Sequence, residues 1–456
     1  MATPPSTPAE APRLRRTLGL WDLILYGIIV IQPVAPMSVF GVLSDRGRGH
    51  AATAILLAMV AMLFTAISYG RMARAYPSAG SAFTYVGQEI HPVGGFVTGW
   101  SMAMDYMLNP MICIIWCSKA AMNFAPAVPY WAWAIFFFAL FTLLNLRGVR
   151  ASARTNNVLA AFMGIVLAIF FIVAARYLLH QPAGSVGSLT RPFYDPETFN
   201  LKLVLSGTSI AVLTYIGFDG ISTLSEEAKN PRRDILLATV FTCVAIGVLS
   251  LVQVYLAELI WPAKQGYPDV DTAFVHVAKR AGGPLLFALI NFTLLAANIG
   301  SGMGAHLGAA RLLYGMGRSN ALPKRFFGAV DPKRHIPRNN VIFVGVVALV
   351  GAFLITYGLG AEMLNFGALI AFMGVNLAAF MRYYLREKTH TVGNFLPPLL
   401  GFAVCFLLWI NLSWPAKLWG SVWLVAGLIF AAIKTRGFRG ELLNFDIPAE
   451  EPRASA

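Results

Sequence analysis

The sequence is poor in charged residues. Asp, Glu, Lys and Arg together make up only 12% of its 456 residues, whereas hydrophobic residues make up 57%. Soluble domains carry roughly 25% charged residues. This shortage excludes a soluble globular domain and predicts an all-α integral membrane protein with many spans.

Acidic residues are scarcer than basic ones, so the formal net charge is +14. Such an excess can indicate nucleic-acid binding. Here, however, most Lys and Arg lie in short segments between apolar runs, where they act as orientation signals. We therefore expect a lipid bilayer and no nucleic acid as partner.

Cysteine and histidine are also rare. The four cysteines lie inside apolar runs, where they are typical packing residues and indicate no disulfide framework. The sequence contains no cluster of metal-ligand residues, and the segments between its apolar runs are too short for a catalytic domain. We expect no metal, no cofactor and no enzymatic activity.

What the chain has in abundance is long apolar runs. About twelve candidate spans follow from the rule of about 20 apolar residues per spanning helix: 20–43, 52–71, 94–124, 131–146, 158–178, 203–224, 235–260, 284–313, 341–357, 364–384, 395–412 and 419–433. Segments rich in Lys and Arg, such as GRMARAYP and RGVRASAR, alternate with poorer ones. The rich side is cytoplasmic, which puts both termini in the cytoplasm of a plasma-membrane protein.

The N-terminal segment MATPPSTPAEAPRLRR has no apolar core before its arginines, so no cleavable signal peptide is predicted. We interpret residues 1–17 as a disordered tail, 18–436 as one transmembrane domain and 437–456 as a C-terminal tail.

Two spans contain helix breakers at mid-membrane depth. The first carries two prolines within 32–36, and the sixth carries two glycines flanking an aspartate at 217–220. Proline removes a backbone donor, and glycine loosens a helix. Five spans separate one break from the other, so the two broken helices enter from opposite sides. This is the sequence pattern of a transporter built from inverted repeats, with its site at the breaks.

The repeats would cover 18–180 and 200–388, and 393–436 would form two further helices. A weaker similarity between the two repeats is that HPVGGF stands at the start of the third span and RAGGPLLF at the start of the eighth.

Ionisable residues inside spans are candidates for function. Asp219 in the sixth-span break is either a cation or proton site, or a cap for freed backbone donors. Asp105 in the third span is either a ligand for one end of a diamine or a proton, or the partner of a polar group on a neighbouring helix. Lys119 lies too far along the same helix to pair with Asp105, and we expect it to extend to the interface.

His306 in the eighth span is a candidate for proton coupling, with an interhelical hydrogen bond as the alternative. Glu226 and Glu227 are placed at the cytoplasmic mouth, where Arg71 or Arg74 could pair with them as an inner gate.

Several segments resemble the amino acid–polyamine–organocation (APC) superfamily: YGRMARAYPSAGSAFTYVGQ, FDGISTLSEEAKNPRRDI and GAARLLYGMGRSNALP. TGWSMAMDYMLNPM and LNFGALIAF are most similar to bacterial putrescine importers. The resemblance implies the leucine-transporter fold, with a 5+5 inverted repeat and broken helices 1 and 6, alternating access and proton-driven uptake. The sequence departs from the family where amino-acid permeases carry a Gly-Ser/Ala-Gly run, because 32–36 reads QPVAP.

These features together predict a permease that imports a small cationic amine, putrescine or a polyamine, coupled to protons. The alternative is an amino acid permease of the same superfamily, working by uptake or exchange. Substrate identity, coupling ion and oligomeric state stay open. The predicted substrate site consists of Gln32, Val34, Ala35, Trp100, Asp105, Tyr106, Tyr215, Gly217, Phe218, Asp219 and Gly220. Proton coupling is assigned to Asp105, Asp219 and His306, and the gate to Glu226, Glu227 and Arg71.

Overall fold

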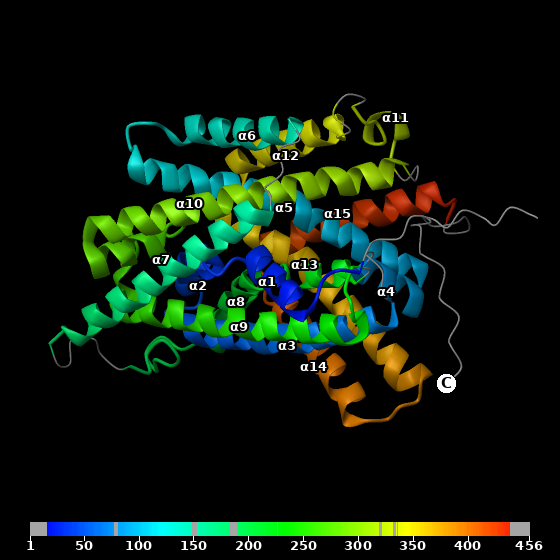
Figure 1. Ribbon diagram of the computed structural model, residues 1–456, viewed down its shortest axis with the longest axis horizontal. Coiled ribbons are helices and arrows are strands. Elements are labelled where there is room, and N and C mark those ends of the chain that lie inside the picture. The colour runs from blue at the N-terminus through cyan, green and yellow to red at the C-terminus, as the bar shows by residue number, and fades with distance from the viewer. Residues whose placement is uncertain are drawn as a thin grey trace, which may run out of the picture.

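The chain folds into a bundle of helices, most of which run along the longest axis of the molecule (Figure 1). The computed structural model describes residues 16–76, 81–147, 153–182, 189–225, 227–318, 322–331, 334 and 336–437. Parts of both predicted tails lie outside these ranges.

The α-helices are α1 (Leu20–Ile31), α2 (Ala35–Arg46), α3 (Ala51–Ala75), α4 (Ser81–Glu89), α5 (Pro92–Phe124), α6 (Tyr130–Leu146), α7 (Ala153–Leu179), α8 (Leu201–Ala211), α9 (Pro231–Ile260), α10 (Ala273–Arg318), α11 (Lys324–Phe327), α12 (Arg338–Leu354), α13 (Tyr357–Phe380), α14 (Val392–Ile410) and α15 (Trp414–Lys434). Shorter elements are the 3₁₀ helices η1 (Val212–Thr214), η2 (Phe218–Leu224) and η3 (Ala263–Gln265), and the π-helix η4 (Met381–Arg386).

Each of the twelve predicted spans coincides with a described helix or helix pair. Within the described ranges, eight helices are long and apolar enough to cross a membrane, and α1 with α2 forms a ninth, broken span. The apolar helices α6 and α12 are shorter. The third predicted span corresponds to α5, whose 33 residues are long enough to cross but include Asp105 and Lys119.

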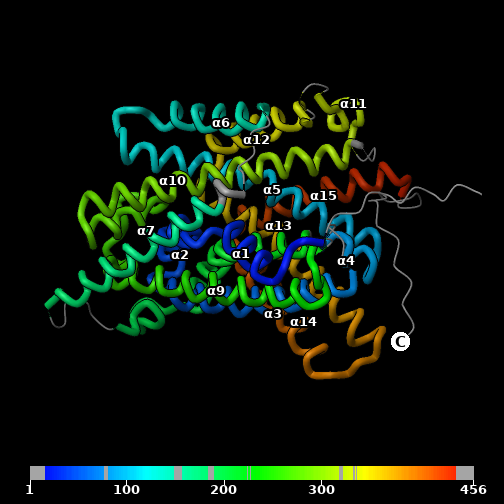
Figure 2. The backbone as a smooth tube through the Cα atoms, viewed as in Figure 1, coloured from blue at the N-terminus to red at the C-terminus, as the bar shows by residue number. Residues whose placement is uncertain are grey.

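Two groups of long helices form the interior. Helix α3 packs along α9, and α5 packs against α10 and α13. Figure 2 shows α3, α9 and α10 running lengthwise through the molecule. Because α5 is covered by α10, α12 and α13, its middle, where Asp105 lies, is placed inside the bundle.

The first predicted break is confirmed. Helices α1 and α2 meet at an angle of 48°. Gln32 ends α1 with a positive φ of 69°, and its side-chain amide donates to the carbonyl of Ala297 in α10 at 3.0 Å. The amide of Gln253 in α9 donates to the carbonyl of Pro33 at 3.0 Å. The Gln253 side chain thus satisfies one backbone carbonyl of the break, and the Gln32 side chain ties the break to α10.

The second break is also confirmed, but it begins earlier than the glycines. Helix α8 ends at Ala211 and tightens into η1 before Gly217, which adopts a φ of 122°. The chain continues as the 3₁₀ helix η2, where a second α-helical half was expected. Such 3₁₀ segments within a span are typical of hinges and of strained sequences.

The sequence similarity between the starts of the third and eighth spans has a structural counterpart. A short helix, α4, precedes Pro92 at the start of α5. Similarly, the first part of α10 ends at Gly283, whose φ of 73° kinks the helix before Pro284. A short helix followed by a proline-started span therefore occurs in both halves. The exact limits of the two repeats stay a prediction.

Candidate functional site

The two breaks lie against each other. A Cβ added to Gly217 would lie 3.1 Å from the Val30 side chain and 3.2 Å from that of Ile31, at the end of α1. A Cβ added to Gly220 would lie 3.9 Å from the hydroxyl of Tyr26 in α1. The irregular backbone of the sixth span is therefore packed on the last two turns of α1.

Asp219 caps the broken backbone. Its Oδ1 accepts a hydrogen bond from the N–H of Gly217 at 3.2 Å. A carboxylate that accepts a backbone N–H compensates a donor that the break would otherwise leave unpaired. This contact is the one expected of a structural cap, and the choice between the two predicted roles of Asp219 stays a prediction.

Asp105 has a different environment. It lies on the regular helix α5 and retains some accessible surface. Among the described residues, none donates a hydrogen bond to its carboxylate or forms an ion pair with it. It lies within electrostatic range of the Asp219 carboxylate. An acid inside a bundle requires a cationic or hydrogen-bonding partner, so Asp105 is the side chain best placed to hold a cation.

Three tyrosines lie near Asp219, and one of them, Tyr106, also lies near Asp105. Tyr26, Tyr69 and Tyr106 all lie within electrostatic range of Asp219. Tyr26 and Tyr106 are 36% and 37% exposed, whereas Tyr69 is fully buried and its hydroxyl has no hydrogen-bond partner among the described residues. Aromatic faces bind ammonium groups through cation–π attraction, so two acids and three tyrosines form a cluster suited to an amine.

Tyr106 packs closely against Gly308 of α10. A Cβ added to Gly308 of α10 would touch the Tyr106 ring at 3.1 Å, whereas one added to Gly304, one turn earlier, would meet nothing within 4 Å. The third and eighth spans therefore meet at Tyr106. Tyr26 and Tyr69 were missed in the sequence because tyrosines within spans are common and carry no distinguishing pattern.

Three predicted aromatic or flanking residues lie elsewhere. The Trp100 indole donates to the carbonyl of Trp423 at 2.8 Å and stacks on that ring, so it faces α15. The Tyr215 hydroxyl donates to the carbonyl of Ile55 in α3 at 3.0 Å. Both predictions are corrected: these side chains are consumed by helix–helix contacts and do not join the acidic pair.

Phe218 is also fully buried. Its ring packs edge-on against Tyr69 at 5.5 Å and lies 5.4 Å from Phe372. The ring therefore supports Tyr69 from behind. Its predicted place in the substrate site stays a prediction, and the structure gives the ring a packing role behind Tyr69.

The first break offers few free amides. Of the residues at 32–36, Pro33 and Pro36 have no N–H. The N–H groups of Gln32 and Ala35 donate to the carbonyls of Ile28 and Gln32 at 3.0 and 3.1 Å. Val34 is 1% exposed. The backbone here is therefore poorly equipped to hold a carboxylate.

His306 is placed away from the acidic pair. Its Nε2 lies 2.7 Å from the carbonyl of Val341 in α12, and the side chain is 1% exposed. This is the interhelical hydrogen bond that the sequence left open as the alternative to proton coupling.

The predicted inner gate is only partly described. Glu226 lies outside the described residues. The carbonyl of Glu227 accepts from the N–H groups of Thr17 and Leu18 at 2.9 and 3.0 Å, which ties the start of α1 to the end of the sixth span. Arg71 donates to the Gly393 carbonyl at 2.6 Å and to Asn394 at 3.0 Å. Its predicted pairing with Glu227 is therefore corrected, because its guanidinium is directed at the start of α14.

Glu89 provides an ion-pair cluster that the sequence analysis missed. Its buried carboxylate pairs with Arg382 at 2.7 Å and Arg386 at 2.8 Å, and accepts from the Tyr76 hydroxyl at 2.7 Å. Glu89 is the last residue of α4, and only the fold brings η4 to it.

Lys119 does more than extend to the interface. It pairs with Asp269 at 3.3 Å and with Asp271 at 2.5 Å, both in the loop before α10. Burial raises the pKa of Asp271 above its ordinary value, although the hydrogen bond from Lys119 opposes this. The pair closes the end of α5 that lies farthest from the Glu89 cluster.

Comparison with known proteins identifies the family. The amino acid permease family matches residues 36–439. The low-affinity putrescine importer PlaP of Escherichia coli (strain K12) is 36% identical over 446 residues, which cover 95% of this chain and 96% of the relative. The branched-chain amino acid permease BcaP of Bacillus subtilis (strain 168) is 25% identical over 450 residues, covering 93% and 94%. The methylthioribose transporter of the same organism is 26% identical over 473 residues, covering 96% and 97%. The chain belongs to the amino acid permease family of the APC superfamily, and it is a multi-pass membrane transporter of leucine-transporter fold and not an enzyme.

Proposed function

We propose that this permease imports a small diamine, with putrescine as the best candidate, by alternating access. The observation that carries the proposal is the Asp105 carboxylate, which has no partner among the described residues and lies within electrostatic range of Asp219. A diamine has a cationic group at each end and no carboxylate. Two acids therefore match it better than they match a zwitterion.

In this proposal the two acids act differently. Asp105 binds one ammonium group directly, with Tyr106 and Tyr26 supplying cation–π contact. Asp219, already held by backbone amides, adds negative potential without giving up its hydrogen bonds. Tyr69 donates or accepts through its unpartnered hydroxyl. The scarcity of free amides at 32–36 supports an amine over an amino acid, because carboxylate capture at a half-helix needs such donors.

The relatives support the same choice without deciding it. The putrescine importer of E. coli is more similar to the chain than the branched-chain permease is. Since that permease also covers nearly the whole chain, an amino acid permease is the second candidate. We further propose coupling to protons through Asp105 or Asp219, a bacterial plasma-membrane location, and both termini in the cytoplasm, as the Lys and Arg distribution predicts.

Uptake into proteoliposomes tests the proposal. The purified protein should take up radiolabelled putrescine saturably. An inward proton gradient should accelerate uptake, and excess leucine should not compete. Empty liposomes and liposomes with collapsed gradients are the controls. Saturable uptake of a neutral amino acid that putrescine does not inhibit would contradict the diamine assignment and favour the second candidate.

A further inference from the structure

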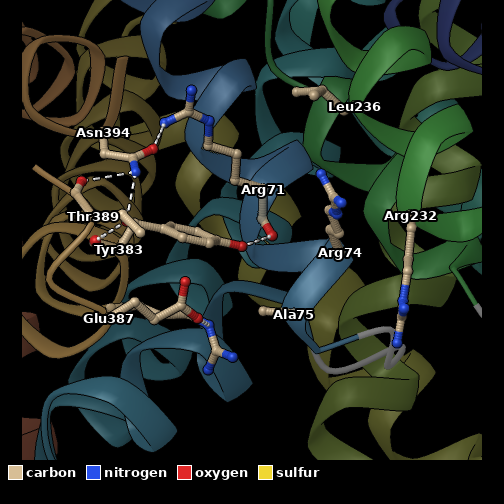
Figure 3. A pocket seen from close by; sticks show the side chains of 10 residues that line it. Arg71, Arg74, Ala75, Arg232, Leu236, Tyr383, Glu387, Thr389 and Asn394 are labelled. Atoms are coloured by element: carbon tan, nitrogen blue, oxygen red, sulfur yellow. Dashed lines mark hydrogen bonds and ion pairs between the residues drawn. The ribbon is translucent and has the colours of Figure 1, made fainter. Parts of the chain in front are cut away.

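A basic cavity lies at the end of the molecule that carries the Glu89 cluster. It has a volume of about 530 Å³ and lies between the end of α3, the start of α9, η4 and the start of α14. Its polar lining consists of Arg71, Arg74, Arg232, Arg382, Tyr383, Glu387, Thr389 and Asn394. Figure 3 shows Arg74 between Arg71 and Arg232, with Glu387 on the other side of the space.

The charges around this cavity are not balanced. Glu387, the acidic residue in the lining, lies 3.3 Å from Arg382, which is also paired with Glu89. Arg71 is hydrogen-bonded only to the neutral groups of Gly393 and Asn394. In the part of the chain that the structure describes, Arg74 and Arg232 have no acidic partner. Among the described residues, the guanidinium groups of Arg71, Arg74 and Arg232 therefore line one space without an acidic partner, since Glu387 is paired with Arg382.

We propose that this cavity binds a phosphate group, carried either by a phospholipid headgroup or by a small soluble phosphate. Guanidinium groups present planar pairs of N–H donors that match phosphate oxygens, and they bind phosphate with directional, charge-assisted hydrogen bonds. An anion would also relieve the mutual repulsion of the three arginines.

The position of the cavity fits this ligand chemistry. Helix α3 ends at Ala75 and α9 begins at Pro231. The cavity therefore lies where membrane-length helices end, at the depth of lipid headgroups. Basic pockets between such helices bind anionic headgroups on the positively charged side of a membrane protein. A bound phosphate would join α3 and α9 to η4 and α14 across the cavity.

Thermal unfolding of the purified full-length chain in a zwitterionic detergent tests the proposal. Two probes are titrated separately: inorganic phosphate, and short-chain phosphatidylglycerol with phosphatidylcholine as its matched neutral lipid. Sodium chloride at equal ionic strength controls for screening. The variants are Arg74→Gln and Arg232→Gln, with Arg74→Lys to retain charge. Arg147→Gln removes a charge at the exposed end of α6, outside the cavity lining.

We expect one or both probes to raise the melting temperature of the wild type, with phosphate acting beyond sodium chloride and phosphatidylglycerol beyond phosphatidylcholine. Arg74→Gln and Arg232→Gln should each weaken the apparent affinity about tenfold or more, Arg74→Lys should weaken it less, and Arg147→Gln should leave it unchanged. Stabilisation by phosphatidylglycerol alone assigns the site to a lipid, and stabilisation by phosphate assigns it to a soluble anion.

Equal stabilisation by the neutral controls would overturn the proposal, as would a response that survives both glutamine variants. If neither glutamine variant folds, the wild-type titrations and Arg74→Lys still decide it, because a wild type that responds to neither probe contradicts the proposal. The measurement does not depend on transport, so failure here would leave the diamine proposal untouched.

Discussion

The middle of α5 and the break in the sixth span each place one aspartate in the same cluster, but the two acids have opposite relations to their backbone. At the break, the N–H of Gly217 donates to the Asp219 carboxylate at 3.2 Å. On α5 the backbone groups are satisfied by the helix itself, so nothing local binds Asp105. An acid beside irregular backbone therefore stabilises the fold, whereas an acid on an intact helix inside the bundle stays available to a ligand.

The largest expected effect comes from removing the available acid. Asp105→Asn keeps the shape of the side chain and removes its charge. If Asp105 binds an ammonium group, the loss should be about 3 kcal/mol, which lowers kcat/KM for putrescine uptake on the order of 100-fold. Proteoliposome uptake measures it. Glu197→Gln, in an exposed loop, controls for the loss of one negative charge. Uptake by Asp105→Asn within threefold of wild type would contradict the assignment.

The next effect concerns the geometry of the sixth-span break. Gly217→Ala places a Cβ on a residue with a φ of 122° and within 3.1 Å of Val30. We expect a destabilisation of about 1–3 kcal/mol, measured as a lower melting temperature. Gly220→Ala is the matched control, because its nearest neighbour lies 3.9 Å away and its φ is not positive. Equal losses in the two variants would show that the backbone at Gly217 is not strained.

Melting temperatures of variants at Asp219 and Asp105 distinguish the roles of the two acids. Asp219→Ala leaves the amide of Gly217 without its acceptor and should destabilise the ligand-free protein by about 1–2 kcal/mol. Asp219→Asn should recover part of this, because its side-chain oxygen still accepts. Asp105→Asn should not lower the melting temperature, since the native carboxylate has no partner to lose. A loss at Asp105 as large as that at Asp219 would remove the distinction between them.

The smallest effect lies at the first break. Gln32→Ala loses the hydrogen bond to the Ala297 carbonyl, and we expect about 1 kcal/mol of destabilisation. Gln32→Glu is the comparison variant, because a charged carboxylate of nearly the same shape cannot donate to that carbonyl. An unchanged melting temperature in both variants would show that prolines alone hold the bend.

Much of the fold was predictable because its determinants are local. Long apolar runs predicted the spans, the prolines at 32–36 predicted the first bend, and the glycines at 217–220 predicted the second. The end of the α-helix at Val212 was not predictable, because the sequence has no helix breaker there. The 3₁₀ segment that begins at Val212 packs against α2, α3 and α13, which lie far from it in the sequence.

The acidic residues of the site could be predicted from the sequence, whereas its aromatic residues could not. Asp105 and Asp219 stand out because charge is rare within spans. Trp100, Tyr215 and Phe218 have the same chemistry as Tyr26 and Tyr69, and only the rotation of each helix decides which rings face the acids. The pairing of Glu89 with η4 joins residues nearly 300 positions apart, and no local pattern encodes it.

The most direct test of the account is calorimetric binding of putrescine to purified wild type, Asp105→Asn and Asp219→Asn, with 1-aminobutane as the single-charge analogue. The account predicts that Asp105→Asn loses putrescine affinity by about 100-fold, that Asp219→Asn retains it within roughly tenfold, and that 1-aminobutane binds the wild type more weakly than putrescine. Binding by Asp105→Asn as tight as wild type, with loss confined to a folded Asp219→Asn, would contradict the claim that Asp105 is the acid available to the ligand.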